Sequence, residues 1–419
     1  MASRSERNVI QKEAHSLRGS FFWLCPLIFL LTVRSYAQTD LPDRPAADQD
    51  SHVPLGDRIA GENSAAAKLR VRGLLQVWYG NGFGDAINGS NALNASLVPL
   101  GRNLGGRGRE MLRFRRAQVA LEGAPAPRMD FRLMLDASAP NADGASLLRD
   151  AWIGYRITPR LRLEIGQQKT GLSEEGTRDD GALLTVARAI MNEDLPPVAG
   201  RVGNVRSPGI ALRYRGGPVQ GFAGLWHSNG ETPGGGDTLH LKFLDGALYY
   251  KGGRYVTVGI WGGTHVGLAQ PAEGRDRAGG TFILRCGPHY FEGEAAYARD
   301  HTAGAPGPRR IGTISNGFNF LYAHTLSRKW QLVARYEFWN PDENEAAAKT
   351  GAPGITENGV TLMNFDHKLK EYTFGINYYL PAQHAKIQVN YIRVDSEVNA
   401  PLFFGKQRTV LLANIQVAF

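Results

Sequence analysis

The connections between amphipathic segments alternate strictly between short and long in this 419-residue chain, and few folds allow such a pattern. From Lys68 to the last residue, stretches in which apolar and polar residues alternate are separated in turn by tight turns, such as Gly217-Pro218 and Gly287-Pro288, and by longer loops. Most stretches have about ten to thirteen residues, enough for a tilted strand to cross a bilayer. A soluble sandwich has no reason for this alternation, whereas an outer-membrane barrel has short periplasmic turns and long external loops.

We therefore predict an all-β fold, a transmembrane antiparallel β-barrel of about sixteen strands formed by residues 68–419, with short periplasmic turns and long extracellular loops. An even number of strands places both ends of the barrel on the periplasmic side. The predicted strands span residues 68–80, 110–123, 128–137, 147–157, 160–169, 207–216, 219–229, 238–250, 253–266, 277–286, 289–299, 314–325, 329–339, 367–380, 383–395 and 407–419.

The two faces of the predicted strands differ in the way that a membrane barrel requires. In the segment 128–137, Phe131 and Leu133 share one face, and Asp130 and Arg132 share the other. A charged side chain that faces lipid near the midplane costs about 2–4 kcal/mol, so the apolar face must point to lipid and the charged face to a water-filled lumen. A soluble barrel would point its apolar face inward, but sixteen strands enclose too much space for side chains to fill.

The first residues have the features of an export signal. Basic residues precede an apolar stretch from Phe21 to Val33, and Ser35-Tyr36-Ala37 follows. This order predicts a signal peptide over residues 1–37 and a flexible periplasmic segment over residues 38–67. The net charge of the chain is +9, and the predicted signal carries five basic and two acidic residues, which leaves +6 for the mature chain. A mildly basic balance suits an anionic ligand without requiring one.

The chain ends on an aromatic residue that closes an alternating segment. Phe419, Val417 and Ile415 are apolar, and Gln416 and Asn414 lie between them. In an outer-membrane barrel the last strand closes against the first and is read by the barrel-assembly machinery, so we predict that Phe419 is the membrane-insertion signal. Taken alone, this segment fits an edge strand of a soluble sandwich equally well, and the alternating connections favour the barrel.

The longest predicted loop, residues 170–206 (loop three), is expected to narrow the pore. It contains the apolar stretch Leu183 to Met191, which needs a surface to pack against, so we predict that loop three folds into the lumen. The other reading places the loop outside, on neighbouring loops or on a partner subunit. Its acidic residues could pair with lumen arginines or bind Ca²⁺ through oxygens, although they lack EF-hand spacing.

Basic residues on the polar faces and in loop three are the candidate pore-lining and anion-binding residues, because rings of Arg or Lys favour anions. They are Arg115, Arg116, Arg132, Arg156, Arg162, Lys169, Arg178, Arg188 and Arg213. Strand parity would place Arg115 and Arg116 on opposite faces, so we expect a β-bulge there. For the cluster of Arg113, Arg115 and Arg116, the other reading is a structural network of ion pairs. The carboxylate partners in that network would be Glu122, Asp136, Asp150 and Glu164.

The sequence contains no catalytic arrangement: there is no GxSxG elbow, HExxH or CxxC motif, or Walker A loop. His227, Ser228 and Asn229 are the residue types of a barrel phospholipase, but neighbouring strand residues point to opposite faces. The mature chain has one cysteine, Cys286, and therefore no internal disulfide, and its histidines show no metal-ligand spacing. We expect no enzyme activity, no metal, no cofactor and no nucleic-acid partner.

Several segments together resemble the phosphate-selective porin O and P family. They are FRRAQVALEG at 114–123, DFR at 130–132, LRDAWIGY at 148–155, LEIGQQKTGLSEE at 163–175, LVARY at 332–336 and YTFGINYY at 372–379. The resemblance implies a barrel that is usually trimeric, with loop three folded inward, basic residues along the lumen, and passage of phosphate or polyphosphate in the best-studied members. Lys169 matches the family's strand-end lysine and Arg116 its strand-two arginine. Loop three departs from the family because its cations after Lys169 are all arginines.

We therefore predict a porin of the bacterial outer membrane that passes small hydrophilic solutes by passive diffusion, with a preference for phosphate-like anions. The expected partners are small anionic or polar solutes, outer-membrane lipid, the barrel-assembly machinery and, by the resemblance, identical subunits in a homotrimer. The alternative is a general or sugar-type diffusion porin, for which Trp78, Trp152, Trp226 and Trp339 could offer stacking surfaces. A third hypothesis is a plugged barrel that acts as an enzyme or an adhesin.

Overall fold

The computed structural model describes most of the chain from residue 68 onward. The described residues are 68–84, 110–138, 147–192, 202–227, 241–267, 275–300, 313–340, 355–357, 360–362, 368–380, 385–396 and 407–419. The predicted signal peptide (1–37) and the predicted lead-in (38–67) lie outside them. In these residues, no helix has the length and apolar character needed to span a membrane.

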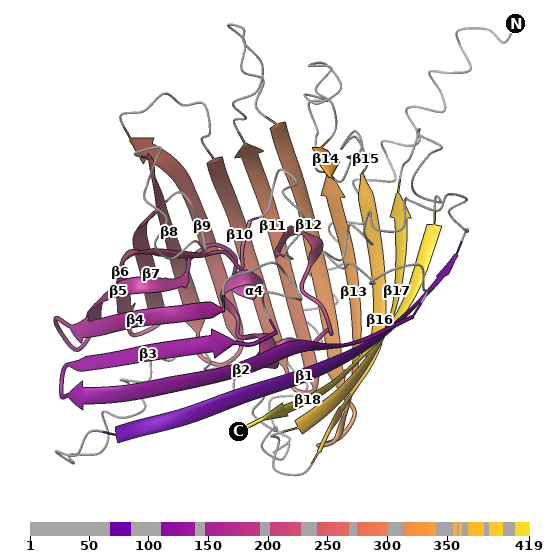
Figure 1. Cartoon of the computed structure of the whole chain (residues 1–419), viewed down its shortest axis with the longest axis horizontal. Coiled ribbons are helices and arrows are strands. Elements are labelled where there is room, and N and C mark those ends of the chain that lie inside the picture. Colours follow the sequence, from indigo (N-terminus) through magenta and orange to yellow (C-terminus); the bar gives the residue numbers. More distant parts are fainter. Residues whose placement is uncertain are drawn as a thin grey trace, which may run out of the picture. The chain divides into compact units, whose positions relative to one another are not determined.

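Sixteen antiparallel strands form a closed barrel in which each strand pairs with its neighbours in the chain and the first pairs with the last (Figure 1). The barrel strands are β1 (Lys68–Gly84), β2 (Glu110–Ala126), β3 (Met129–Asp136), β4 (Leu148–Arg156), β5 (Leu161–Lys169), β6 (Arg206–Gly216), β7 (Val219–His227), β8 (Leu241–Gly252), β9 (Val256–Gly267), β10 (Arg275–Cys286), β11 (His289–Asp300), β12 (Thr313–Thr325), β13 (Trp330–Asn340), β16 (Leu369–Tyr379), β17 (Ala385–Ser396) and β18 (Gln407–Ala418).

Each predicted strand corresponds to one strand of the barrel, and the ends differ by at most four residues, so the predicted fold is confirmed. The sequence did not reveal the short hairpin of β14 (Ile355–Glu357) and β15 (Val360–Leu362), which lies in the connection between β13 and β16. It also did not reveal the short helix α4 (Glu174–Thr177) and two 3-10 turns, at 180–182 and 190–192, in loop three. These elements have only three or four residues, too few to produce a recognisable period.

The strands are apolar outside and polar inside, as their alternation predicts. Ile153 and Ile165 face outward and are 56% and 53% exposed, while Asp130 and Glu164 face inward and are buried. Their strands are joined in register, with Ile153 opposite Ile165 and both on the lipid side. Lipid covers the outward apolar residues, and the inward charged residues find partners within the lumen.

The expected β-bulge is present in β2. Gln76 of β1 pairs with Arg116, and the next residue, Val77, pairs with Phe114, so Arg115 is the extra residue. The side chains of both Arg115 and Arg116 are consequently buried on the inner face, while Phe114 remains exposed on the outer face. One inserted residue thus allows two consecutive arginines to face the lumen.

The barrel closes between β1 and β18, where the C-terminal residue takes part in the pairing (Figure 1). The Gly73 N–H donates to the Phe419 carbonyl at 2.8 Å, and the Phe419 N–H donates to the Gly73 carbonyl at 3.1 Å. The Phe419 ring covers the bare backbone of Gly73, because a Cβ at residue 73 would lie 2.1 Å from the ring. The terminal aromatic residue is therefore part of the seam of the barrel.

We predict that Gly166→Ala destabilises the barrel by about 1–3 kcal/mol. Gly166 has φ 133°, which L residues rarely adopt, and an added Cβ would lie 2.1 Å from the Ala151 carbonyl oxygen. The measurement is the denaturant midpoint of unfolding followed by tryptophan fluorescence. Gly293→Ala is the control, because the nearest atom to its added Cβ is 3.7 Å away. Equal midpoints for the two variants would contradict the prediction.

Candidate functional site

Loop three begins by attaching to the inner wall of the barrel at β8 and β11. The Gly171 N–H donates to Asp245 Oδ2 of β8 at 2.8 Å, and the Ser173 hydroxyl donates to Glu294 Oε2 of β11 at 2.8 Å. Glu294 Oε1 also accepts the Glu174 N–H at 2.7 Å. These carboxylates hold the start of the loop inside the barrel, where Figure 1 shows α4 enclosed by the strands.

The short helix α4 is stabilised by its first residues. Ser173 is the N-cap, and its hydroxyl oxygen accepts the Gly176 N–H at 2.9 Å. Glu174 and Glu175 follow in the first turn, where negative charge is favourable. Glu175 Oε2 then accepts the Ala189 N–H at 2.8 Å, so the helix also fixes the return of the loop.

The middle of loop three binds to amide and amine side chains of the last three strands. The Leu183 carbonyl accepts from Lys386 Nζ at 2.7 Å, and the Leu184 carbonyl accepts from Asn377 Nδ2 at 2.9 Å. Asn390 Oδ1 accepts the Val186 N–H at 2.7 Å. The inner faces of β16 and β17 thus satisfy backbone groups that the irregular loop leaves unpaired.

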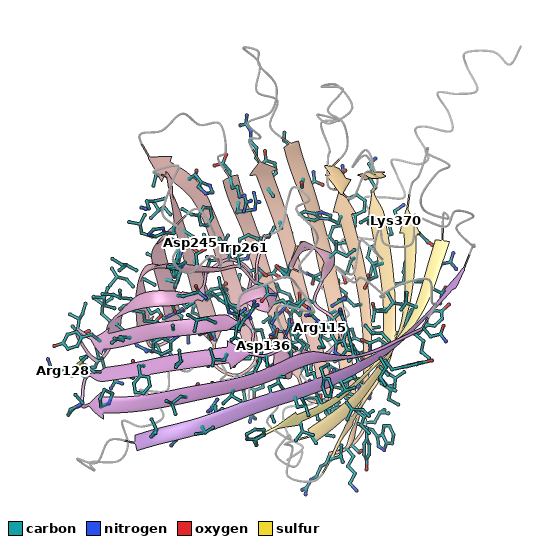
Figure 2. All side chains as sticks on the ribbon, viewed as in Figure 1. Arg115, Arg128, Asp136, Asp245, Trp261 and Lys370 are labelled. Carbon is teal, nitrogen blue, oxygen red and sulfur yellow. The ribbon has the colours of Figure 1, made fainter. Side chains whose placement is uncertain are left out.

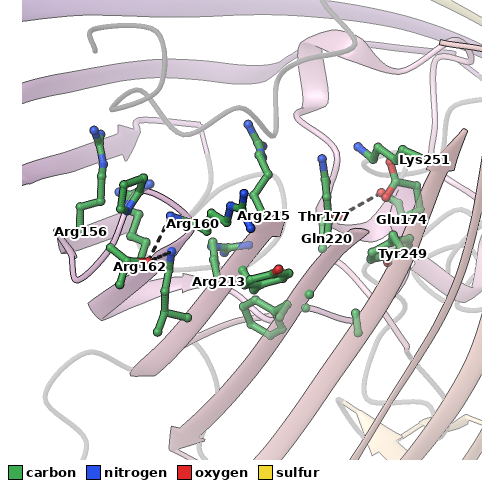
Figure 3. A pocket seen from close by; sticks show the side chains of 18 residues that line it. Arg156, Arg160, Arg162, Glu174, Thr177, Arg213, Arg215, Gln220, Tyr249 and Lys251 are labelled. Carbon is green, nitrogen blue, oxygen red and sulfur yellow. Dashed lines mark hydrogen bonds between the residues drawn. The ribbon is translucent and has the colours of Figure 1, made fainter. Parts of the chain in front are cut away.

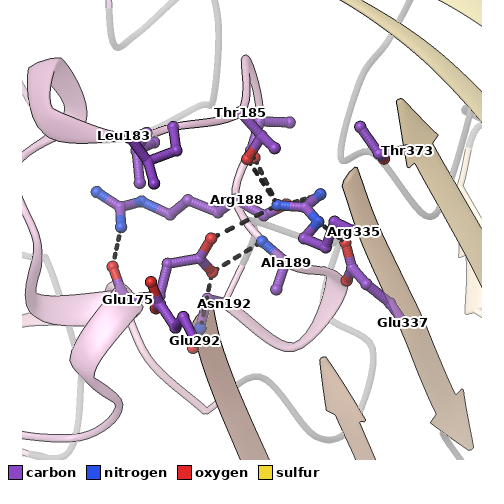
Figure 4. Close-up of polar contacts among 12 residues, drawn as sticks. Glu175, Leu183, Thr185, Arg188, Ala189, Asn192, Glu292, Arg335, Glu337 and Thr373 are labelled. Atoms are coloured by element: carbon purple, nitrogen blue, oxygen red, sulfur yellow. Dashed lines mark hydrogen bonds and ion pairs between the residues drawn. The ribbon is translucent and has the colours of Figure 1, made fainter. Parts of the chain in front are cut away.

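Arg335 of β13 is the central anchor of the loop (Figure 4). It donates to Thr185 Oγ1 at 2.8 Å and to the Ala187 carbonyl at 2.9 Å. The same guanidinium forms ion pairs with Glu337, with Glu371 at 3.2 Å and with Glu175 at 3.5 Å. A buried arginine is tolerated here because carboxylates and backbone carbonyls satisfy its donors.

Asp180 anchors loop three to another part of the wall, against β2. Its Oδ2 lies 2.9 Å from Arg116 Nε, and its Oδ1 lies 2.8 Å from Arg188 Nη2. Burial alone would raise the pKa of Asp180, but the charges of Arg116, Arg188, Lys169 and Arg206 outweigh burial and hold the pKa well below its usual value. Asp180 is therefore ionised at neutral pH and joins the loop to the arginine-rich wall.

Most of the predicted pore cations form ion pairs or hydrogen bonds in the structure. On the strands, the shortest distances to a carboxylate oxygen are 2.9 Å for Arg132 to Glu122, 2.5 Å for Arg162 to Asp130 and 2.6 Å for Arg213 to Glu164. In loop three, Arg178 lies 2.9 Å from Glu292, and Lys169 Nζ donates to the Arg178 carbonyl at 2.6 Å. Arg115 stacks on Trp78, with its guanidinium carbon 5.0 Å from the ring centroid. In the cluster on β2, Arg116 lies 3.9 Å from Asp136, one of the carboxylates expected in the ion-pair network.

A cavity of about 110 Å³ lies between α4 and the wall on the side of the short turns (Figure 3). Its charged lining residues are Arg156, Arg160, Arg162, Arg213, Arg215, Lys251 and Glu174. Six of these seven are basic, so the cavity has a positive potential. We name this group of seven the basic vestibule.

Sequence reasoning identified Arg156, Arg162 and Arg213 of the basic vestibule, but it missed Arg160, Arg215 and Lys251 as site residues. Arg160 and Lys251 lie at short turns and Arg215 at the end of β6. Parity places Arg160 and Arg215 on the polar faces of the predicted strands 160–169 and 207–216. Their proximity depends on the register in which β5 pairs with β6 and β7 pairs with β8, which the sequence does not specify across the long connections.

Three of the four tryptophans proposed as stacking surfaces are covered. Trp78, Trp226 and Trp339 are only 3%, 1% and 1% exposed. The indole N–H of Trp226 donates to Asp245 at 2.7 Å. The Arg162 guanidinium stacks over Trp152, with its carbon 4.8 Å from the ring centroid. A sugar ring therefore has no access to the first three rings. In the part of the chain that the structure describes, no group of three His, Cys, Asp or Glu side chains is placed to hold a metal ion.

Comparisons with known proteins give a family and a fold. The model of the family described as phosphate-selective porin O and P matches residues 98–260 and 315–419. Similar solved structures include the channel DcaP of Acinetobacter baumannii (TM-score 0.55, 12% identity, 85% of this chain and 99% of that chain). They also include a loop L8 deletion mutant of OmpT of Vibrio cholerae (TM-score 0.55, 10% identity, 84% of this chain and 100% of that chain). Salmonella typhi OmpF in complex with daunomycin is similar as well (TM-score 0.55, 10% identity, 85% of this chain and 98% of that chain). A search of curated proteins found no match.

We predict that Arg335→Gln loosens loop three and destabilises the barrel by about 3–5 kcal/mol, because it leaves buried carboxylates without their partner. Single channels of this variant should show larger current noise, and chemical unfolding should occur at lower denaturant concentration. Arg299→Gln is the control, because Arg299 lies on the outer side of β11, opposite Asp276, and therefore does not face loop three. Quiet channels with an unchanged unfolding midpoint would contradict an anchoring role for Arg335.

We predict a defined pH dependence for the Asp180 contact. Because the folded pKa is depressed, the contribution of Asp180 to stability is complete above its unfolded pKa of about 4 and is lost as pH falls below that value. The difference in unfolding temperature between the wild type and Asp180→Asn should therefore be constant from neutral pH to about pH 5 and shrink in stronger acid. A difference that grows on acidification would show that the sign is wrong.

Proposed function

The chain belongs to the phosphate-selective porin O and P family, and we propose that its outer-membrane pore passes small hydrophilic solutes by passive diffusion with a preference for phosphate-like anions. The closed sixteen-strand barrel with a polar inner face supports the channel. The basic vestibule supports the preference for anions. Its six cations and one carboxylate are the single observation on which that preference rests.

The exposure of the vestibule makes its charge available to a solute. Arg213 retains 37% side-chain exposure although it pairs with Glu164, so part of its guanidinium faces the cavity. Paired arginines still carry donors that can bind phosphate oxygens, because a guanidinium has five N–H groups. A narrow, partly desolvated passage strengthens this attraction compared with bulk water.

The alternative, a general or sugar-type diffusion porin, has less support from the geometry. Sugar porins require aromatic faces that a solute can reach. Trp78, Trp226 and Trp339 are covered by wall and loop side chains, and Trp152 is stacked with Arg162. Among the described residues, the accessible lining beneath loop three is therefore mainly cationic rather than aromatic.

The remaining parts of the proposal come from the sequence and from the family. We propose that residues 1–37 direct export, that residues 38–67 form a periplasmic lead-in, and that Phe419 serves as the assembly signal in addition to its place in the seam. We further propose that the channel acts as a homotrimer without enzyme activity or cofactor. Each of these statements is independent of the ion selectivity of the pore.

We predict that neutralising three cations of the basic vestibule, Arg156, Arg160 and Lys251, by substitution with Gln lowers the permeability ratio of chloride to potassium by up to about tenfold. A factor of ten corresponds to about 1.4 kcal/mol, the order of magnitude of a few weakened charge interactions in a hydrated pore. The measurement is the reversal potential of single channels in a salt gradient. Lys242→Gln is the matched control, because Lys242 is on the outer side of β8.

A wild-type channel that prefers potassium would overturn the proposed anion preference. Inhibition of chloride current by phosphate but not by sulfate would support phosphate-like selectivity. Inhibition by oligosaccharides without any effect of phosphate would instead favour the sugar-type alternative.

A further inference from the structure

Charged side chains on the outer surface of the barrel gather at one end. Among the strand residues whose side chains the structure describes, the outward-facing Lys, Arg, Asp and Glu residues all lie next to the long connections. They are Lys242, Asp276, Arg299, Lys370, Arg393 and Asp395. The end with long connections is the extracellular end of an outer-membrane barrel. These charges therefore lie at the level of the outer leaflet.

Three of these residues form one group on β16 and β17. Lys370, which is labelled in Figure 2, is directly opposite Asp395 in the register of the two strands. Arg393 is opposite Tyr372. Arg393 Nε lies 3.1 Å from Asp395 Oδ1, and the Arg393 side chain is 43% exposed. The group carries two positive charges and one negative charge, so it has a net charge of +1.

An aromatic surface adjoins this group on β12, β13 and β16. The ring centroids of Tyr336 and Tyr372 are 5.1 Å apart, and those of Phe318 and Tyr336 are 5.8 Å apart. Farther from the long connections, Phe374 and Tyr391 are exposed on the same outer face. Tyrosines mark the interface between headgroups and acyl chains, so the cations lie on the headgroup side of this boundary.

The charges do not serve mainly to stabilise the barrel. An exposed ion pair such as that of Arg393 and Asp395 contributes about 0–1 kcal/mol. Asp395 engages the Nε group of Arg393, and the Arg393 side chain is still 43% exposed. Arginine donors in this arrangement match the oxygens of a phosphate, and a nearby lysine adds a point charge.

We propose that Arg393 and Lys370 bind a phosphate group of a glycolipid in the outer leaflet, with the aromatic surface contacting the adjoining acyl chains. A phosphate monoester is the ligand because it presents several acceptor oxygens and more than one negative charge. This site is on the outside of the barrel and does not depend on which solute the pore carries.

The test uses the full-length protein in detergent with bisphosphorylated lipid A as the probe. Lipid A should raise the unfolding temperature of the wild type, and dephosphorylated lipid A should raise it much less. The double variant Arg393→Gln with Lys370→Gln should lose at least half of the lipid A effect. Lys242→Gln, which removes an outward cation at the same end of β8, should retain it.

A second variant and a second ligand separate the remaining explanations. Asp395→Asn keeps both cations and removes the competing carboxylate, so it should increase the lipid A effect; a loss would overturn the proposal. Inorganic phosphate at the same concentration should leave the unfolding temperature unchanged, and an equal rise would assign the site to free phosphate instead of lipid. Equal effects of lipid A and its dephosphorylated form would also overturn the proposal.

Discussion

The structure depends on the requirement that every backbone N–H and C=O group within the membrane finds a partner in the protein. A sheet meets this requirement only when it closes, and here β1 and β18 close it through Gly73 and Phe419. In the regular parts of the strands, closure then assigns each residue to lipid or to lumen by its parity. The outer apolar surface and the inner network of arginines and carboxylates are two consequences of this one constraint.

The same requirement applies to loop three, which has irregular backbone inside the barrel. Its carbonyl and N–H groups are satisfied by Lys386, Asn390 and Arg335, whose side chains extend inward from the wall. The inner polar face is therefore both a wall for solutes and a set of partners for the loop. A cation that supports the loop has fewer donors left for a solute, which explains why the accessible positive charge lies beneath the loop in the basic vestibule.

The strands, their faces and the bulge at Arg115 could be predicted from sequence because each is encoded by neighbours within a few residues. The site was harder to predict. That Arg116 and Asp180 form an ion pair depends on the conformation of loop three, and that Arg160 and Lys251 line one cavity depends on the pairing of the four strands β5 to β8. The sequence showed which residues carry charge and on which face, but a choice between pore lining and ion-pair network needed distances between strands.

The extra residue in β2 also determines what the deletion of one residue does to this strand. In a regular strand, deletion of one residue would exchange the lipid and lumen faces for everything on one side of the deletion. In β2 the bulge already shifts the alternation of faces by one residue. Phe114 and Val119 both face lipid although they are separated by an odd number of positions. Loss of Arg115 would leave Phe114 and Arg116 adjacent, with lipid and lumen faces still correct on both sides. The strand therefore contains one codon whose deletion preserves the membrane topology of the protein.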